Sequence, residues 1–151
     1  MLKPILLVED NPNDLELTLI ALEKSKLANE VIVVRDGAEA LDYLECAGAY
    51  AKRTAGNPAV VLLDLKLPKV DGLEVLRHIR ETAELKSVPV VMLTSSKEEQ
   101  DLLRSYELGV NAYVVKPVEF SEFVRAISDL GVFWAVLNEP PPGSVRYVPR
   151  T

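Results

Sequence analysis

Acidic, hydroxyl and amine side chains follow four short apolar runs of this sequence, each at the point where the run ends. In chain order these side chains are Glu9, Asp10, Asp64, Thr94 and Lys116. When such runs form a parallel sheet, ligands bind at the carboxyl ends of its strands. Any one of these residues alone would be an ordinary polar group where a chain leaves its core. Together, they predict a site at which three carboxylates, a hydroxyl and an amine converge.

Three carboxylates in one pocket require compensation for their charge. Two like charges about 4 Å apart cost on the order of 4 kcal/mol at an effective dielectric constant of ~20. Mg²⁺ fits such a pocket best, because it prefers oxygen ligands and pairs one or two carboxylates with water and phosphate oxygens. With the metal present, a carboxylate can attack phosphorus and form an acyl phosphate. Lys116 and Thr94 can then interact with the phosphoryl oxygens, so the residues predict phosphoryl transfer to an aspartate.

Apolar runs alternate with helix-period segments from one end of the chain to the other. The runs cover residues 5–8, 31–34, 60–63, 90–93 and 112–115. Continuous apolar runs are expected for strands that are covered on both faces. The alternation therefore predicts a doubly wound α/β domain, with a mostly parallel five-stranded sheet and helices on both faces.

Local signals predict where several helices begin and end. Asn11 can cap a helix whose first turn holds Pro12, and the turn at residues 36–37 leads into a second helix. Gly109 can terminate a later helix. The apolar residues of that later helix are Leu102, Leu103 and Tyr106. The second apolar run ends in Arg35, which is less distinctive than the other strand ends.

Composition excludes several classes of function. The formal net charge is −6, which disfavours nonspecific binding to nucleic acid and to an anionic membrane surface. Cys46 is the single cysteine and cannot form an intramolecular disulfide. The start of the chain lacks a signal-peptide pattern, and no apolar run reaches the roughly 20 residues that span a bilayer. We therefore expect a cytoplasmic protein that binds neither nucleic acid nor membrane.

Four segments resemble the motifs of response-regulator receiver domains. They read Val-Glu-Asp-Asn at 8–11, Leu-Asp-Leu-Lys-Leu-Pro-Lys-Val-Asp-Gly at 63–72, Met-Leu-Thr-Ser at 92–95 and Tyr-Val-Val-Lys-Pro at 113–117. The resemblance covers roughly residues 4–130, with the motifs in the family's order and spacing. It implies the flavodoxin-like strand order 2-1-3-4-5. It also implies a single-domain response regulator of a two-component phosphorelay, which accepts a phosphoryl group from a sensor histidine kinase.

The resemblance also assigns roles to the residues of the site. Asp64 would be the phosphoacceptor, and Lys116 would contact the phosphate. Glu9 and Asp10 would form the acidic pocket, with Asp10, Asp64 and the backbone carbonyl of Lys66 holding Mg²⁺. The side chain of Lys66, two residues after the acceptor, can affect the loss of phosphate. Such a protein promotes only its own phosphorylation and dephosphorylation, so we do not expect an enzyme.

The same resemblance implies a switch behind the acceptor. Thr94 would be the hydroxyl that moves onto the phosphoryl group, and Tyr113 the aromatic side chain that follows it. A cis peptide bond is expected before Pro117.

The same residues argue against four alternative classes of protein. A flavodoxin-like electron carrier needs a cradle for its cofactor phosphate after the first strand, where this chain has the acidic segment 9–14. The familiar aspartyl phosphatases carry a second acid two residues after the nucleophile, where this chain has Lys66. A dinucleotide-binding enzyme needs Gly-x-Gly-x-x-Gly after the first strand, which is absent. A receiver-shaped module that is never phosphorylated would not need the complete set of acids, Thr and Lys.

A narrower similarity concerns the kinase partner. The long loop after the second expected helix and the segment 67–72 are similar to regulators that partner bacterial phytochromes. The expected partner is therefore a sensor histidine kinase of the bacteriophytochrome class.

The end of the chain departs from a minimal receiver. We expect the receiver domain at 1–137 and a Pro-rich arm at 138–151, with no DNA-binding module after it. Aromatic and branched residues continue into this region, including Trp134, and a disordered tail is usually poor in them. We therefore expect a homodimer through the fourth helix, fifth strand and fifth helix. Trp134 and Leu137 would extend that surface, and exchange of the arm between subunits is left open.

Overall fold

We describe the 151-residue chain from a computed structural model. The residues it describes are 3–24, 28–54, 56–95, 98–116, 121, 122 and 125. Several expectations fall outside these residues: the cis bond before Pro117, the last helix from Phe120 with Trp134 and Leu137, and the arm at 138–151.

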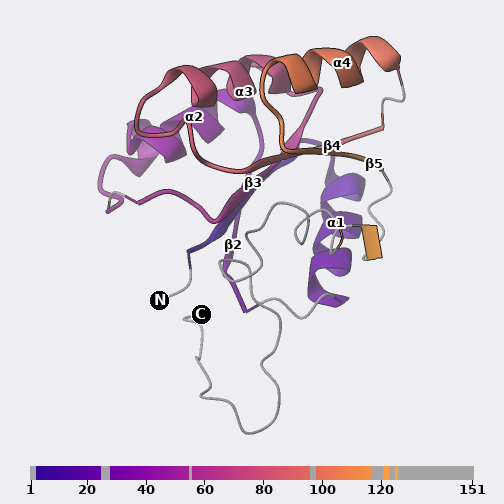
Figure 1. The fold of residues 1–151 in the computed structure, drawn as a ribbon. Helices are drawn as coiled ribbons and strands as arrows, with labels where there is room; N and C mark the ends of the chain where they lie inside the picture. The colour runs from indigo at the N-terminus through magenta and orange to yellow at the C-terminus, as the bar shows by residue number, and fades with distance from the viewer. Residues whose placement is uncertain are drawn as a thin grey trace, which may run out of the picture.

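The described residues form a parallel sheet of five strands in the order β2-β1-β3-β4-β5 (Figure 1). The strands are β1 Ile5–Val8, β2 Val31–Val34, β3 Val60–Asp64, β4 Val90–Thr94 and β5 Ala112–Val115. In the centre of the sheet, Leu6 of β1 pairs with Ile32 of β2 and with Val61 of β3. The predicted fold class and strand order are confirmed. Asp64 and Thr94, expected just after their strands, are the last residues of β3 and β4.

Helices cover both faces of the sheet. They are α1 Pro12–Lys24, α2 Gly37–Glu45, α3 Gly72–Glu81 and α4 Glu99–Glu107, with a short 3₁₀ helix η1 at Gly48–Tyr50. Figure 1 shows α1 on one face of the sheet and α2, α3 and α4 on the other. No helix among the described residues is long and apolar enough to cross a membrane.

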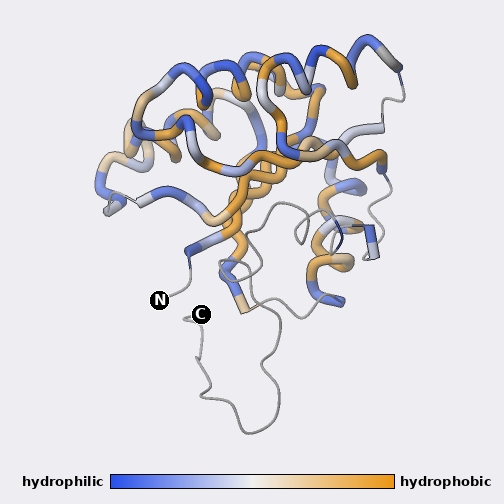
Figure 2. Tube along the Cα trace, in the orientation of Figure 1, coloured by the Kyte–Doolittle hydropathy of each residue, from blue (hydrophilic) through white to orange (hydrophobic). Residues whose placement is uncertain are grey.

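The core is divided by the sheet into two layers. One cluster joins the sheet to α2 and α3 and includes Leu44, Leu76 and Ile79. The other joins the opposite face to α1 through Leu22. Strands β1, β3 and β4 are buried along their whole length, and each reads as an apolar run up to the last residue of β3 and β4. Figure 2 shows the centre of the sheet as hydrophobic.

Side-chain caps fix the starts of three helices. Asn11 Oδ1 accepts hydrogen bonds from the backbone N–H of Asn13 and Asp14 at 2.9 and 3.0 Å. Asp36 Oδ1 accepts from the N–H of Glu39 at 2.7 Å. Asp71 caps α3 in the same way. The predicted helix starts at Asn11 and at 36–37 are therefore confirmed.

Helix α4 presents its apolar residues to solvent. Leu103 and Tyr106 are 54% and 51% exposed, whereas Ser105 is buried and donates its hydroxyl to the carbonyl of Asp101 at 2.8 Å. Gly109, with φ +92°, donates its N–H to the carbonyl of Tyr106 just past the helix end. The predicted end of the helix is confirmed, and its outer face has apolar side chains that the sheet does not cover.

Candidate functional site

The predicted site residues lie at one edge of the sheet, where the parallel strands end. Asp64 closes β3 and Thr94 closes the neighbouring β4. The backbone N–H of Lys116, just after β5, donates to the carbonyl of Thr94 at 2.8 Å. Glu9, just after β1, donates its N–H to Val34 at 3.0 Å. The sheet therefore brings together side chains that are more than 100 residues apart in sequence.

Lys116 is the centre of this cluster. Its Nζ lies 2.5 Å from Glu9 Oε1, 3.0 Å from Asp14 Oδ2 and 3.2 Å from Asp64 Oδ2. The lysine side chain is only 8% exposed. Burial alone would lower the pKa of Lys116, but its hydrogen bonds to Glu9 and Asp14 raise the pKa above its ordinary value. The ammonium group is therefore kept charged directly beside Asp64.

Glu9 faces the lysine and is 1% exposed. Its Oε1 accepts from Lys116, and its Oε2 accepts from the backbone N–H of Asn11 at 3.2 Å. Burial raises the pKa of Glu9 to about 7, and nearby Asp64 adds to this effect while Lys116 opposes it. Both oxygens of Glu9 are therefore engaged within the protein.

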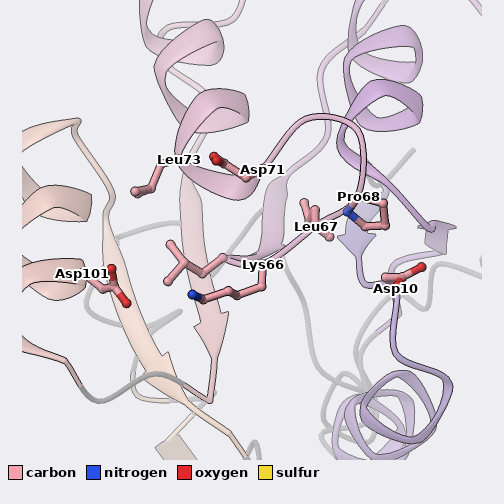
Figure 3. Close-up of a pocket in the computed structure, with 8 residues that line it drawn as sticks. Asp10, Lys66, Leu67, Pro68, Asp71, Leu73 and Asp101 are labelled. Atoms are coloured by element: carbon pink, nitrogen blue, oxygen red, sulfur yellow. The ribbon is translucent and has the colours of Figure 1, made fainter.

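Asp10 and Lys66 line a separate hollow beside this cluster. It is a cavity of about 420 Å³ next to the loop between β3 and α3 (Figure 3). Its lining residues are Asp10, Leu65, Lys66, Leu67, Pro68, Asp71, Leu73 and Asp101. Figure 3 shows Asp10 and Asp101 on opposite sides, with the Lys66 side chain extending from between them. The cavity is open to solvent at exposed Lys66 and is large enough for a phosphoryl group with water.

Two glycines fix the loop that carries Lys66. A Cβ on Gly72 would lie 2.2 Å from the carbonyl oxygen of Asp64, and the N–H of Gly72 donates to Leu65 at 2.8 Å. A Cβ on Gly37 would lie 1.8 Å from the carbonyl oxygen of Val70. Only glycine permits these approaches, so the start of α2 and the start of α3 both hold the loop against the end of β3.

Arg35 and Asp14 are residues of the site that the sequence reasoning missed. Arg35 donates to the carbonyl of Asp10 at 2.8 Å, and its own N–H donates to Glu39 Oε1 at 2.9 Å. Tyr50, in η1, donates its hydroxyl to Glu39 Oε2 at 2.7 Å. The position of Arg35 at a strand end was a usable signal. Asp14 gave none beyond its place in the first turn of a helix.

Asp10 and Asp64 have the donor chemistry that Mg²⁺ requires. Within the described ranges, no group of three or more His, Cys, Asp or Glu side chains is already arranged around a metal position. Mg²⁺ does not need such a cage, because it keeps several waters and is commonly held by one or two carboxylates together with phosphate oxygens. Asp64 and the Asp10 that lines the cavity therefore fit this ion as an oxygen donor set.

Thr94 and Tyr113 occupy adjacent strands behind the site. Thr94 is buried at the end of β4. Tyr113, in β5, pairs with Met92 of β4 and packs partly buried against the core cluster of α2 and α3. Thr94 itself pairs with Val115, so Tyr113 lies two residues earlier along the neighbouring strand β5.

Comparisons with known proteins agree with this geometry. The family model of the response regulator receiver domain matches residues 5–128. Response regulator Rcp1 of Synechocystis sp. is 41% identical over 132 residues, which are 87% of this chain and 88% of that protein. A solved structure of Rcp1 in its Mn²⁺-bound form superposes with a TM-score of 0.72, at 41% identity over 88% of this chain and 94% of that one.

Two further solved structures are similar to this chain. The bacteriophytochrome response regulator RtBRR is 74% identical with a TM-score of 0.85, over 95% of this chain and 87% of that one. The phosphorylated cyanobacterial phytochrome response regulator RcpA is 43% identical with a TM-score of 0.73, over 89% and 94% of the two chains.

Proposed function

This chain belongs to the response regulator receiver domain family and is a response regulator of two-component signalling, and we propose that it accepts its phosphoryl group on Asp64. The observation that carries this proposal is the contact between Lys116 Nζ and Asp64 Oδ2 at 3.2 Å. The contact puts a charged ammonium group beside the carboxylate that would attack phosphorus. The charged lysine is then in place for the phosphoryl oxygens.

The transfer moves the phosphoryl group from a histidine of the kinase to Asp64 of this chain. The Asp64 carboxylate attacks the phosphorus of a phosphohistidine, the P–O bond forms, and the P–N bond breaks with the electron pair leaving on the imidazole. Lys116 offsets the charge that is added to the aspartate. Asp10, Asp64 and the backbone carbonyl of Lys66 would hold Mg²⁺, which supplies further positive charge against the phosphoryl oxygens when bound.

Mass spectrometry of the protein after incubation with acetyl phosphate and Mg²⁺ tests the acceptor. The wild type should gain one phosphoryl group as a base-labile acyl phosphate. Asp64→Asn should gain none, because its side chain has no nucleophilic carboxylate. Uptake of one phosphoryl group by that variant at the wild-type rate would show that another residue is the acceptor.

We also propose that Thr94 and Tyr113 carry the signal away from Asp64. A phosphoryl group adds charge and acceptor oxygens at the end of β3, next to the buried Thr94. Movement of the threonine hydroxyl towards it would leave space behind β4 for the ring of Tyr113. The switch would thereby reach the face formed by α4 and β5.

The kinase partner that we propose is a bacterial phytochrome with histidine kinase activity. Its support is the similarity to two phytochrome response regulators, one of them 74% identical. Phosphotransfer from a purified bacteriophytochrome kinase, compared with a kinase of another sensor class, tests this choice. Equal transfer rates from both would remove the preference.

A homodimer is the further assembly that we propose, through α4, β5 and the segment after it. The exposed side chains of Leu102, Leu103 and Tyr106 on α4 support this surface. The receiver would span 1–137, and the arm at 138–151 would add to the contact. Truncation after Asn138 should weaken the dimer in sedimentation equilibrium. If truncated and intact chains show the same association constant, the arm has no role in assembly.

We propose that the protein acts as a phosphoacceptor and not as an enzyme with an external substrate. Lys66 stands where a familiar aspartyl phosphatase has its second acid, and the net charge of −6 disfavours nucleic acid as a partner. We propose that the protein functions in the cytoplasm, where the free thiol of Cys46 stays reduced. Absence of turnover on small phosphate esters, under conditions that phosphorylate Asp64, is the expected result.

A further inference from the structure

We propose that Asp14 is a positioning residue, which acts through Lys116 to keep the ammonium group directed at Asp64. The inference rests on the roles proposed above for Asp64 and Lys116. It adds a third acid to the immediate surroundings of the lysine, contributed by α1 and not by a strand end.

The argument begins with the number of donors on the lysine. An ammonium group has three N–H bonds and no acceptor. Lys116 Nζ has three carboxylate neighbours, Glu9 at 2.5 Å, Asp14 at 3.0 Å and Asp64 at 3.2 Å. Glu9 and Asp14 accept hydrogen bonds from this ammonium group, and Asp64 forms an ion pair with it. The two hydrogen bonds therefore set the direction that remains for the N–H on the side of Asp64.

Asp14 is held in place by the start of its helix. The side chain of Asn11 accepts a hydrogen bond from the backbone N–H of Asp14 at 3.0 Å, and Asn11 also donates its own N–H to Glu9 Oε2 at 3.2 Å. The helix cap thus ties the Asp14 backbone to the same buried glutamate that binds the lysine. Both acceptors that orient Lys116 belong to one hydrogen-bonded segment, residues 9–14.

The contact between Lys116 and Asp14 matters because the lysine is buried. With 8% of its side chain exposed, Lys116 has little water to replace a missing acceptor. Removing Asp14 leaves one N–H without its carboxylate and frees the ammonium group to turn towards Glu9. When Asp64 carries a phosphoryl group, the N–H bonds to Glu9 and Asp14 would hold the third N–H towards a phosphoryl oxygen.

A purely structural explanation of Asp14 exists and makes a different prediction. An acid in the first turn of a helix stabilises the helix through its dipole. That role changes the stability of α1 but does not depend on Lys116. Glu16, exposed on the same helix, provides a charge-matched control, because the carboxylates in contact with the lysine are those of Glu9, Asp14 and Asp64.

The experiment measures phosphorylation of the full chain by acetyl phosphate with Mg²⁺. Asp14→Ala should slow the reaction by about threefold to tenfold, because a partly buried ion pair is lost. Asp14→Asn, which keeps an acceptor oxygen, should recover part of the rate, and Glu16→Ala should match the wild type. In a Lys116→Ala background, Asp14→Ala should cause no further loss, since its effect passes through the lysine. An equal loss in both backgrounds would overturn the proposal.

A second measurement uses the resting protein and needs no phosphoryl transfer. The ¹⁵N-detected ammonium signal of Lys116 should show slow proton exchange in the wild type and faster exchange in Asp14→Ala, with Glu16→Ala unchanged. Unchanged exchange in Asp14→Ala would also overturn the proposal. If the wild type itself takes no phosphoryl group while the exchange result holds, the function proposed for Asp64 fails and the orientation of Lys116 by Asp14 stands.

Discussion

The guanidinium group of Arg35 donates a hydrogen bond of 2.8 Å to the backbone carbonyl of Asp10, so the end of β2 holds the segment that follows β1. Arg35 is itself fixed by Glu39, which also accepts the hydroxyl of Tyr50 from η1. The loop after α2 is thereby connected to the acidic side of the site through three hydrogen bonds in series.

This connection predicts a role for Arg35 in metal binding. Arg35→Ala should weaken Mg²⁺ binding by up to about tenfold, because the backbone of a proposed ligand loses a supporting contact. Titration followed by calorimetry gives the dissociation constant directly. Arg77→Ala removes an exposed arginine on α3 that pairs with neighbouring Glu74, and it should bind Mg²⁺ as the wild type does. Equal affinities of the two variants would show that Arg35 does not support the metal ligand.

The two neighbouring acids after β1 should differ in their effect on the metal. Asp10 lines the open cavity, whereas both oxygens of Glu9 are engaged by Lys116 and by the N–H of Asn11. Asp10→Asn should therefore weaken Mg²⁺ binding more than Glu9→Gln. The same titration ranks them, and a larger loss in Glu9→Gln would reverse the assignment of the direct ligand.

The fold and most of this site could be predicted from the sequence, because the signals are local. Each strand contains an apolar run of at least four residues, and Asn11 and Asp36 are the caps that their types predict. The positions of Asp64 and Lys116 followed from one rule, that parallel strands end at one edge. These features depend on the residue itself and on its nearest neighbours in sequence.

The features that the sequence did not predict depend on contacts and packing between different helices and strands. Asp14 lies 102 residues from Lys116 in sequence, and no local pattern signals that one carboxylate of α1 turns towards the sheet edge. Arg35 contacts a backbone carbonyl, which every residue has, so its partner cannot be read from residue types. The outward-facing Leu103 has the same spacing as a buried leucine would, and only the packing of α4 distinguishes them.

Glu9 should make the stability of the metal-free protein depend on pH. Burial raises the pKa of Glu9 from 4.5 to about 7, so the folded state binds the proton more tightly than the unfolded state. The stabilisation is complete below pH 4.5 and is lost as the pH rises through about 7. Glu9→Gln does not titrate, so its unfolding free energy should fall less than that of the wild type across this window. The two falls should differ by at most about 3 kcal/mol.

Urea unfolding with a chelator present, at several pH values between 4.5 and about 8, measures this difference. Glu16→Gln, an exposed acid of α1, should follow the wild type. Parallel pH profiles for wild type and Glu9→Gln would mean that Glu9 titrates alike in the folded and unfolded states.

Removing the Thr94 hydroxyl should leave phosphorylation of Asp64 intact but block the structural response of Tyr113. Thr94→Ala keeps Asp64, Lys116 and the proposed metal ligands, so it should still gain one phosphoryl group. It lacks the hydroxyl that would move towards that group, so the environment of Tyr113 should not change on phosphorylation. Tyrosine ring signals in NMR, recorded with and without acetyl phosphate, report this. A wild-type response of Tyr113 in the variant would rule out the threonine as the link.

The outer face of α4 should be the surface that assembles two copies. Leu103 of α4 is 54% exposed and Leu17 of α1 is 53% exposed, so the two leucines form a matched pair on opposite faces of the sheet. Leu103→Glu should weaken the phosphorylated homodimer by at least about tenfold, because a charge would be buried in an apolar contact. Leu17→Glu places the same charge on an equally exposed site outside the proposed surface and should dimerise as the wild type does. Sedimentation equilibrium after acetyl phosphate treatment, which bypasses any kinase contact, gives both constants. If Leu17→Glu weakens the dimer and Leu103→Glu does not, the subunits meet through α1 and not through α4.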